Sequence, residues 1–85
     1  MKQFQHTVTI PGGIHARTTG QLTTLTTGYS STVTVLCGSA KANLRRPFEL
    51  LAMGVQQGQT VTVQAEGDDE AACIAALQQL FETSV

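Results

Sequence analysis

Residues 4–17 read FQHTVTIPGGIHAR and carry three signals that decide how the chain begins to fold. Apolar side chains alternate with polar ones over residues 4–10, which predicts a strand with one buried face. A proline and two glycines follow, and this combination is typical of a tight turn that other residues would strain. His15 and Arg17 come next, where the turn gives way to the start of a predicted helix.

His6 lies on the apolar face of the predicted strand, together with Phe4, Val8 and Ile10. Nothing near it in the sequence suggests a set of metal or catalytic ligands. We therefore expect a partly buried strand histidine whose ring makes a local hydrogen bond.

His15 and Arg17 are the candidate chemical residues of the chain. A helix start offers unpaired backbone N–H groups and the positive end of the helix dipole, which favours a neutral, nucleophilic imidazole. A phosphoryl group on His15 would lie over the N–H groups of Ala16, Arg17 and Thr18, with the Arg17 guanidinium close by. The alternative to a chemical role is that His15 is only a solvated or helix-capping residue. No Ser–Asp pair, Cys or carboxylate stands next to His15 to complete a hydrolase triad.

The composition excludes several classes of partner. The 85 residues carry 5 basic and 6 acidic side chains, and this net charge of -1 gives no broad attraction to nucleic acid or to an anionic membrane. No apolar run approaches the roughly 20 residues that span a bilayer, and no signal peptide opens the chain, which predicts a cytoplasmic protein without membrane insertion. Cys37 and Cys73 do not have zinc-site spacing, so we expect two buried thiols, no metal and no cofactor.

The remaining segments each predict an element with one apolar face. Residues 17–27 predict a helix from the three- and four-residue spacing of apolar side chains, although six threonines and Gly20 oppose it and Gly28 would end it. Strands are predicted over 31–37, 40–43 and 60–65, a short helix over 44–54 with Pro47 in its first turn, and a last helix after an acidic cap at 67–70.

This order of elements predicts an α+β fold with a single domain over residues 1–85. A four-stranded antiparallel sheet with three helices on one face, an open-faced β-sandwich, would bury every apolar face.

Residues 13–17, GIHAR, resemble the active-site motif of HPr, the histidine phosphocarrier of the bacterial sugar phosphotransferase system. The resemblance extends over the whole chain, because its length, the positions of Pro11, His15 and Phe48, and its glycine-rich connections all agree with the family. It implies the same open-faced sandwich. It also implies that His15 accepts a phosphoryl group on Nδ1 from enzyme I and passes it to a sugar permease component, with Arg17 as the phosphate partner. Such a protein is a covalent carrier and not a stand-alone enzyme.

Several positions depart from the family pattern. Thr18 stands where a proline usually follows the arginine, and Arg46 stands where many relatives carry a regulatory serine. Glu49 replaces a frequent lysine, and Thr24 and Thr27 replace frequent basic residues. An HPr-like regulatory paralogue, which docks on partner proteins without relaying phosphate, is therefore the alternative.

The resemblance also implies a docking surface close to the His15 loop. Its apolar part would come from the segment after Pro47, extending as far as Met53 or Val55. The residues assigned to it are Arg45, Arg46, Phe48, Glu49 and Leu51.

Overall fold

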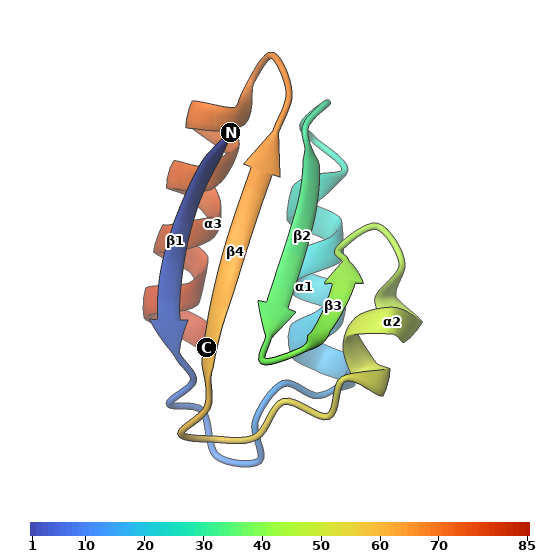
Figure 1. The fold of residues 1–85 in the computed structure, drawn as a ribbon, viewed down its shortest axis with the longest axis vertical. Helices are drawn as coiled ribbons and strands as arrows, with labels where there is room; N and C mark the ends of the chain where they lie inside the picture. The colour runs from blue at the N-terminus through green and yellow to red at the C-terminus, as the bar shows by residue number, and fades with distance from the viewer.

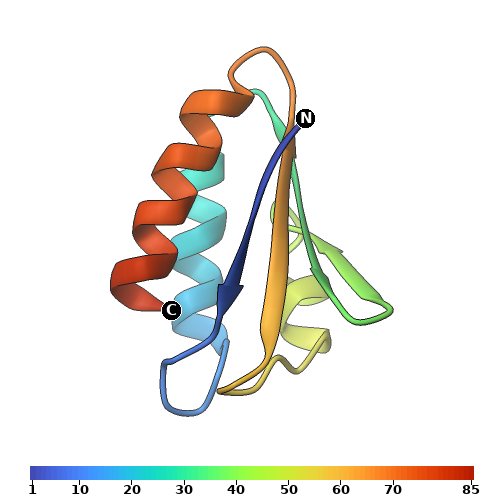
Figure 2. The same ribbon diagram turned by 60° about the vertical axis from the view of Figure 1, so that its left-hand side comes forward.

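The structure is a four-stranded antiparallel sheet whose one face is covered by helices (Figure 1, Figure 2). The computed structural model describes all 85 residues. The strand order is β1-β4-β2-β3, so that β1 and β3 form the two edges. The elements are β1 (Lys2–Thr7), α1 (Ala16–Thr26), β2 (Thr32–Cys37), β3 (Ala40–Asn43), α2 (Pro47–Ala52), β4 (Thr60–Glu66) and α3 (Glu70–Ser84). The predicted fold class is confirmed.

The core lies between the sheet and the helices. Val61, Val63 and Ala65 of the central strand β4 point inward and are fully buried, as the alternating pattern predicts. Buried side chains of α3 meet them from the other side, and Phe81 packs edge-on against Phe4 with ring centroids 5.4 Å apart. The open face of the sheet carries mainly Thr and Gln, which explains the clear alternation in the sequence.

Tertiary contacts stabilise α1, whose sequence favours a helix only weakly. Thr18, Thr19 and Thr26 are buried, and the Thr23 hydroxyl donates to the Leu44 carbonyl oxygen at 2.9 Å. These contacts offset the rotamer entropy that β-branched residues lose in a helix. The helix ends at Thr26 with Thr27 as its C-cap residue, so Gly28 follows at the predicted position, although it does not adopt the left-handed φ that glycine often has there.

Three finer predictions from the sequence are wrong. His6 makes no local hydrogen bond through its buried Nε2, and its ring instead packs against Phe81 with centroids 5.3 Å apart. Cys37 is only partly buried, whereas Cys73 is fully buried and desolvation raises the pKa of its thiol. The side chain of Asp69 does not cap α3 although Asp69 is the N-cap residue.

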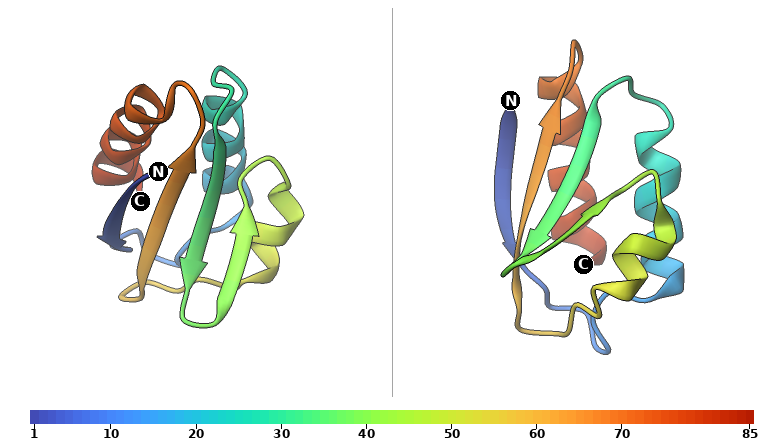
Figure 3. Two further views of the ribbon diagram at one scale, coloured as in Figure 1. Left: turned by 45° about the horizontal axis from the view of Figure 1, so that its top comes forward. Right: turned by 45° about the vertical axis from the view of Figure 1, so that its right-hand side comes forward.

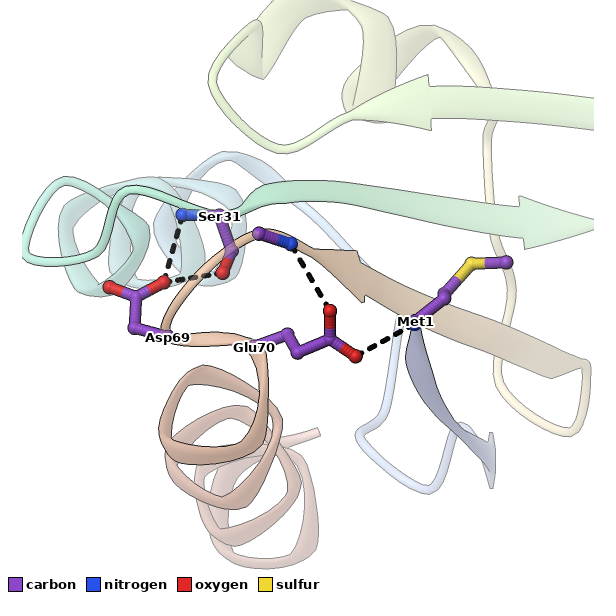
Figure 4. Close-up of polar contacts among 5 residues, drawn as sticks. Met1, Ser31, Asp69 and Glu70 are labelled. Carbon is purple, nitrogen blue, oxygen red and sulfur yellow. Dashed lines mark hydrogen bonds and ion pairs between the residues drawn. The ribbon is translucent and has the colours of Figure 1, made fainter.

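Asp69 instead fixes the connection between α1 and β2 (Figure 4). Its carboxylate accepts hydrogen bonds from the backbone N–H of Ser30 at 2.9 Å, from the N–H of Ser31 at 3.0 Å and from the Ser31 hydroxyl. The Arg45 guanidinium donates to the carbonyl oxygens of Tyr29 and Ser31 in the same connection. In this connection the backbone N–H groups thus bond to the Asp69 carboxylate, and the backbone carbonyl oxygens bond to the Arg45 guanidinium.

The same end of α3 carries a second carboxylate with backbone and charge partners (Figure 4). Glu70 accepts from the N–H of Gly67 at 3.3 Å, and its other oxygen lies 2.8 Å from the amino group of Met1. The bond from the Met1 amino group, followed by that from Gly67, holds the pKa of Glu70 below its usual value.

We predict that Asp69→Asn lowers stability at neutral pH and that this difference shrinks in acid. The bond from the Ser31 hydroxyl, followed by that from the Ser30 N–H, lowers the pKa of Asp69 in the folded state. A lowered pKa contributes stability above the unfolded-state value, about 3.9, which is lost as the pH falls through the folded-state value. The measurement is the urea midpoint between pH 7 and pH 2. Asp68→Asn is the matched control, because the Asp68 side chain makes no hydrogen bond or ion pair. A constant difference between native chain and Asp69→Asn across this range would contradict the prediction.

Candidate functional site

The loop before α1 is held tightly against the connection between α2 and β4. Gly12 and Gly13 both adopt left-handed φ angles, +84° and +73°. A Cβ on Gly13 would lie only 2.1 Å from the carbonyl oxygen of Val55, and the N–H of Ile14 donates to that oxygen at 2.9 Å. Only glycine fits at position 13, and its close approach fixes where the next residues emerge.

His15 is the N-cap residue of α1 and is exposed to solvent. Its backbone is extended (φ −122°, ψ −175°), and its ring makes no capping bond. Its carbonyl oxygen accepts the first intrahelical bond, from Thr19 N–H at 2.9 Å. The three preceding N–H groups, those of Ala16, Arg17 and Thr18, have no acceptor in the protein. The start of α1 therefore has three backbone donors without acceptors, and the exposed His15 is the residue that precedes them.

His15 and Arg17 line one depression of about 480 Å³ at this end of the molecule. Arg17 is exposed and makes no hydrogen bond or ion pair, so its guanidinium is free to meet an anion. The depression lies between the first turns of α1 and the last turn of α3, and Glu82 is its one acidic side chain. The other lining residues are Thr9, Ile10, Pro11, Thr18, Gln21, Thr83, Ser84 and Val85.

The far end of the chain forms part of this site, which the sequence did not indicate. The main-chain oxygen of Val85 accepts hydrogen bonds from the N–H groups of Thr9 at 2.7 Å and Ile10 at 3.0 Å. Glu82 and Thr83 thereby come close to the loop that contains Thr9, which lies 76 residues before Val85 in the sequence. No periodic pattern in either segment signals this contact.

The family described as "PTS HPr component phosphorylation site" matches residues 2–83 of the chain. The chain belongs to the HPr family. Phosphocarrier protein HPr of Lysinibacillus sphaericus is 36% identical over 81 residues, which cover 95% of this chain and 92% of that protein. The crystal structure of HPr from Thermoanaerobacter tengcongensis superposes with a TM-score of 0.91 at 32% identity, covering 98% of this chain and 93% of that one.

A relative of another kind also shares the HPr domain. The phosphoryl donor subunit DhaM of the PEP-dependent dihydroxyacetone kinase of Providencia stuartii is 33% identical over 78 residues. These residues cover 92% of this chain but only 16% of that protein. The HPr fold of this chain is thus similar both to free-standing carriers and to part of a longer donor protein.

The structure distributes the predicted docking residues of this HPr-family chain over two places. Phe48 of α2 is 82% exposed, the most exposed large apolar side chain, and Leu51 beside it is partly buried. The expectation that Val55 lies at the same surface is wrong, because Val55 is 1% exposed and belongs to the core. Arg45 donates to carbonyl groups that follow the C-terminal end of α1, about 16 Å from His15 at the other end of the 11-residue helix.

Glu49 has local partners that its position in the sequence does not reveal. One carboxylate oxygen accepts from Asn43 N–H at 3.0 Å, and the other lies 3.7 Å from Arg46 Nη1. Asn43 in turn accepts from Arg45 N–H at 2.8 Å. Glu49 therefore fixes the connection from β3 to α2 as well as adding negative charge beside Phe48.

Metal and membrane features are both absent from the geometry. No group of three or more His, Cys, Asp or Glu side chains lies close enough to hold a metal ion. No helix has both the length and the apolar character that a crossing of the bilayer requires.

We predict that Gly13→Ala destabilises the protein more than Gly12→Ala does. Both substitutions place a Cβ on a left-handed backbone, which costs about 1–2 kcal/mol. Only the Cβ at position 13 collides with the Val55 carbonyl, whereas the one at position 12 meets nothing within 4 Å. Overpacking of this kind costs roughly 1–3 kcal/mol more. Free energies of unfolding from urea titrations measure the difference, and equal losses for the two variants would show that the close approach does not constrain the loop.

Proposed function

We propose that this chain carries a phosphoryl group on His15, accepting it from enzyme I and passing it to a sugar permease component of the phosphotransferase system. The carrier acts as a single HPr-like domain in the cytoplasm and has no turnover of its own. The observation that supports this most strongly is the exposed imidazole at the N-cap of α1, which shares one depression with an unpaired guanidinium.

The transfer is a displacement at phosphorus. A ring nitrogen of neutral His15, Nδ1 in the family, donates its electron pair to the phosphorus atom, and the bond between phosphorus and the donor breaks with its electrons leaving on the donor. Transfer to the acceptor reverses these roles. Such reactions depend mainly on positioning and on charge stabilisation, because the protein supplies little covalent chemistry besides the nucleophile.

Arg17 and the start of α1 supply the charge stabilisation. The guanidinium can pair two oxygens of a phosphoryl group, and the N–H groups of Ala16 and Arg17 face the same anion from the helix end. Because Arg17 has no partner within the protein, it can meet the phosphoryl group without first breaking another bond.

Thr18 is compatible with carriage of a phosphoryl group, so its presence does not favour the regulatory alternative. The residue is only 2% exposed, but its backbone N–H has no acceptor in the protein. A proline at this position would lack that N–H. The replacement of the family proline by threonine therefore adds a donor at the helix start instead of removing one.

The deciding experiment is phosphoryl labelling from phosphoenolpyruvate by enzyme I, followed by intact mass. We predict one phosphoryl group on the native chain, with the lability of a phosphoramidate, and none on His15→Ala. The substitution should leave the circular dichroism spectrum and urea midpoint unchanged, since the ring is exposed and makes no hydrogen bond. Labelling of His15→Ala, for example on His6, would contradict the assignment.

We further propose that the partners are a dedicated enzyme I or permease system. Glu49 places a carboxylate beside the exposed Phe48, where a partner built for a lysine would meet the wrong charge. Similarity to a donor subunit of dihydroxyacetone kinase supports service to a specialised phosphoryl relay. Arg46 stands close enough to Glu49 to reduce the effect of that charge, which is why the charge must be tested directly.

We predict that Glu49→Lys speeds transfer from a general enzyme I, while Glu49→Gln does so less. The glutamine variant is the matched control, because its amide oxygen can still accept from Asn43 N–H while the charge is removed. Charge at the rim of a docking surface changes mainly the association rate, so the difference should fall as salt is raised. Equal rates for native chain and Glu49→Lys, both matching a general carrier, would refute the specificity argument.

A further inference from the structure

The last turn of α3 lies at the same end of the molecule as the first turn of α1, because the two helices run in opposite directions along the sheet (Figure 2, Figure 3). Glu82, in that last turn, lines the same depression as His15 and Arg17. The backbone on both sides of Glu82 is fixed, since Phe81 is fully buried and Val85 is bonded to the loop before α1. The carboxylate thus belongs to the wall of the depression that contains the imidazole.

No other side chain of the protein pairs with Glu82. It is exposed and makes no hydrogen bond or ion pair, and the last turn of α3 contains no basic residue. The C-terminal end of a helix dipole is itself negative, so a carboxylate in the last turn lowers the stability of the helix slightly. The hydroxyl of the next residue, Thr83, bonds to carbonyl oxygens of its own helix. Glu82 therefore makes no polar contact that would explain its place.

The depression is small enough for its charges to act on an anion inside it. A hollow of about 480 Å³ is roughly 10 Å across, close to the Debye length of about 8 Å at physiological salt, so these charges are only partly screened. A phosphoryl group on His15 carries nearly two negative charges. Arg17 and the start of α1 attract it, whereas Glu82 repels it.

We infer that Glu82 raises the phosphoryl-transfer potential of phosphorylated His15 by electrostatic repulsion. A carrier has to give up the group that it accepts, and a site that only attracted the phosphoryl group would hold it too firmly. The repulsion destabilises the phosphorylated chain alone, because the free imidazole carries no negative charge. The effect does not require Arg17, since no ion pair joins the two side chains. This inference rests on the proposed function and adds to it a residue that opposes retention of the phosphoryl group.

The equilibrium between phosphoenolpyruvate and the carrier tests the inference. In the forward direction the phosphorus–oxygen bond of phosphoenolpyruvate breaks and a phosphorus–nitrogen bond to His15 forms. Pyruvate leaves with the electron pair and takes up the proton that the imidazole loses. Intact mass gives the ratio of phosphorylated to free chain at fixed concentrations of phosphoenolpyruvate and pyruvate. Because enzyme I only catalyses the exchange, this ratio does not depend on how well a variant docks.

We expect Glu82→Gln to raise the equilibrium constant for phosphorylation about two- to fivefold, and Glu82→Lys to raise it further. Glu66→Gln is the matched control, because Glu66 is also exposed but ends β4 away from the depression and does not line it (Figure 1). It changes the net charge equally and should leave the constant unchanged. The effect of Glu82→Gln should shrink as salt is raised and should persist in a chain that also carries Arg17→Ala.

Equal equilibrium constants for the native chain and Glu82→Gln would overturn the inference, as would an equal change in Glu66→Gln or loss of the effect together with Arg17. Slower hydrolysis of phosphorylated Glu82→Gln at an unchanged equilibrium constant would also overturn it, because Glu82 would then act on the attacking water. A native chain that takes up no phosphoryl group would remove the proposed function and the inference together. A native chain that is labelled, with an equilibrium insensitive to Glu82, would remove the inference alone.

Discussion

The hydrogen bond from Ile14 N–H to the carbonyl oxygen of Val55 is the contact on which the arrangement of the site depends. It joins the loop before α1 to the connection before β4, and Gly13 allows the two backbones to approach closely enough for it to form. A second set of backbone bonds ties Thr9 and Ile10 to Val85. Two connections and Val85 are thus held together at one end of the sheet, and these bonds fix the loop from which His15 emerges.

The two ends of α1 differ in how their backbone groups are hydrogen-bonded. The C-terminal end is fixed by charged side chains, whereas the N-terminal end leaves donors free beside the candidate site. After its C-terminal end, the connection is held by Arg45 on its carbonyl oxygens and by Asp69 on its N–H groups. At its N-terminal end, the backbone N–H groups are left without acceptors beside His15. Backbone N–H groups without hydrogen-bond acceptors in the protein make the start of a helix less stable. The buried threonines of α1 and the hydrogen bonds beyond its C-terminal end hold the helix in place.

The helices and strands could be predicted from the sequence, but the contacts between their ends could not. Alternation over residues 60–65 and the apolar stripe of α3 reflect burial on one face, which acts on every second or every third to fourth residue and so leaves a readable pattern. The carboxylate of Asp69 bonds to Ser31, 38 residues earlier, and nothing in a local pattern distinguishes that partner from its own helix. The place of Val85 and Glu82 at the site has the same origin, since tertiary proximity of two irregular segments has no period.

Of the three arginines of the chain, two have partners within the protein and one has none. Arg45 bonds to the carbonyl oxygens of Tyr29 and Ser31, and Arg46 lies 3.7 Å from Glu49. Arg17 alone has no partner, although Glu82 lines the same depression. An anion that enters the depression therefore meets a guanidinium that gives up no existing bond, with the N–H groups of α1 beside it. Because the whole chain has a net charge of only -1, no broad attraction to anions or cations competes with this local one.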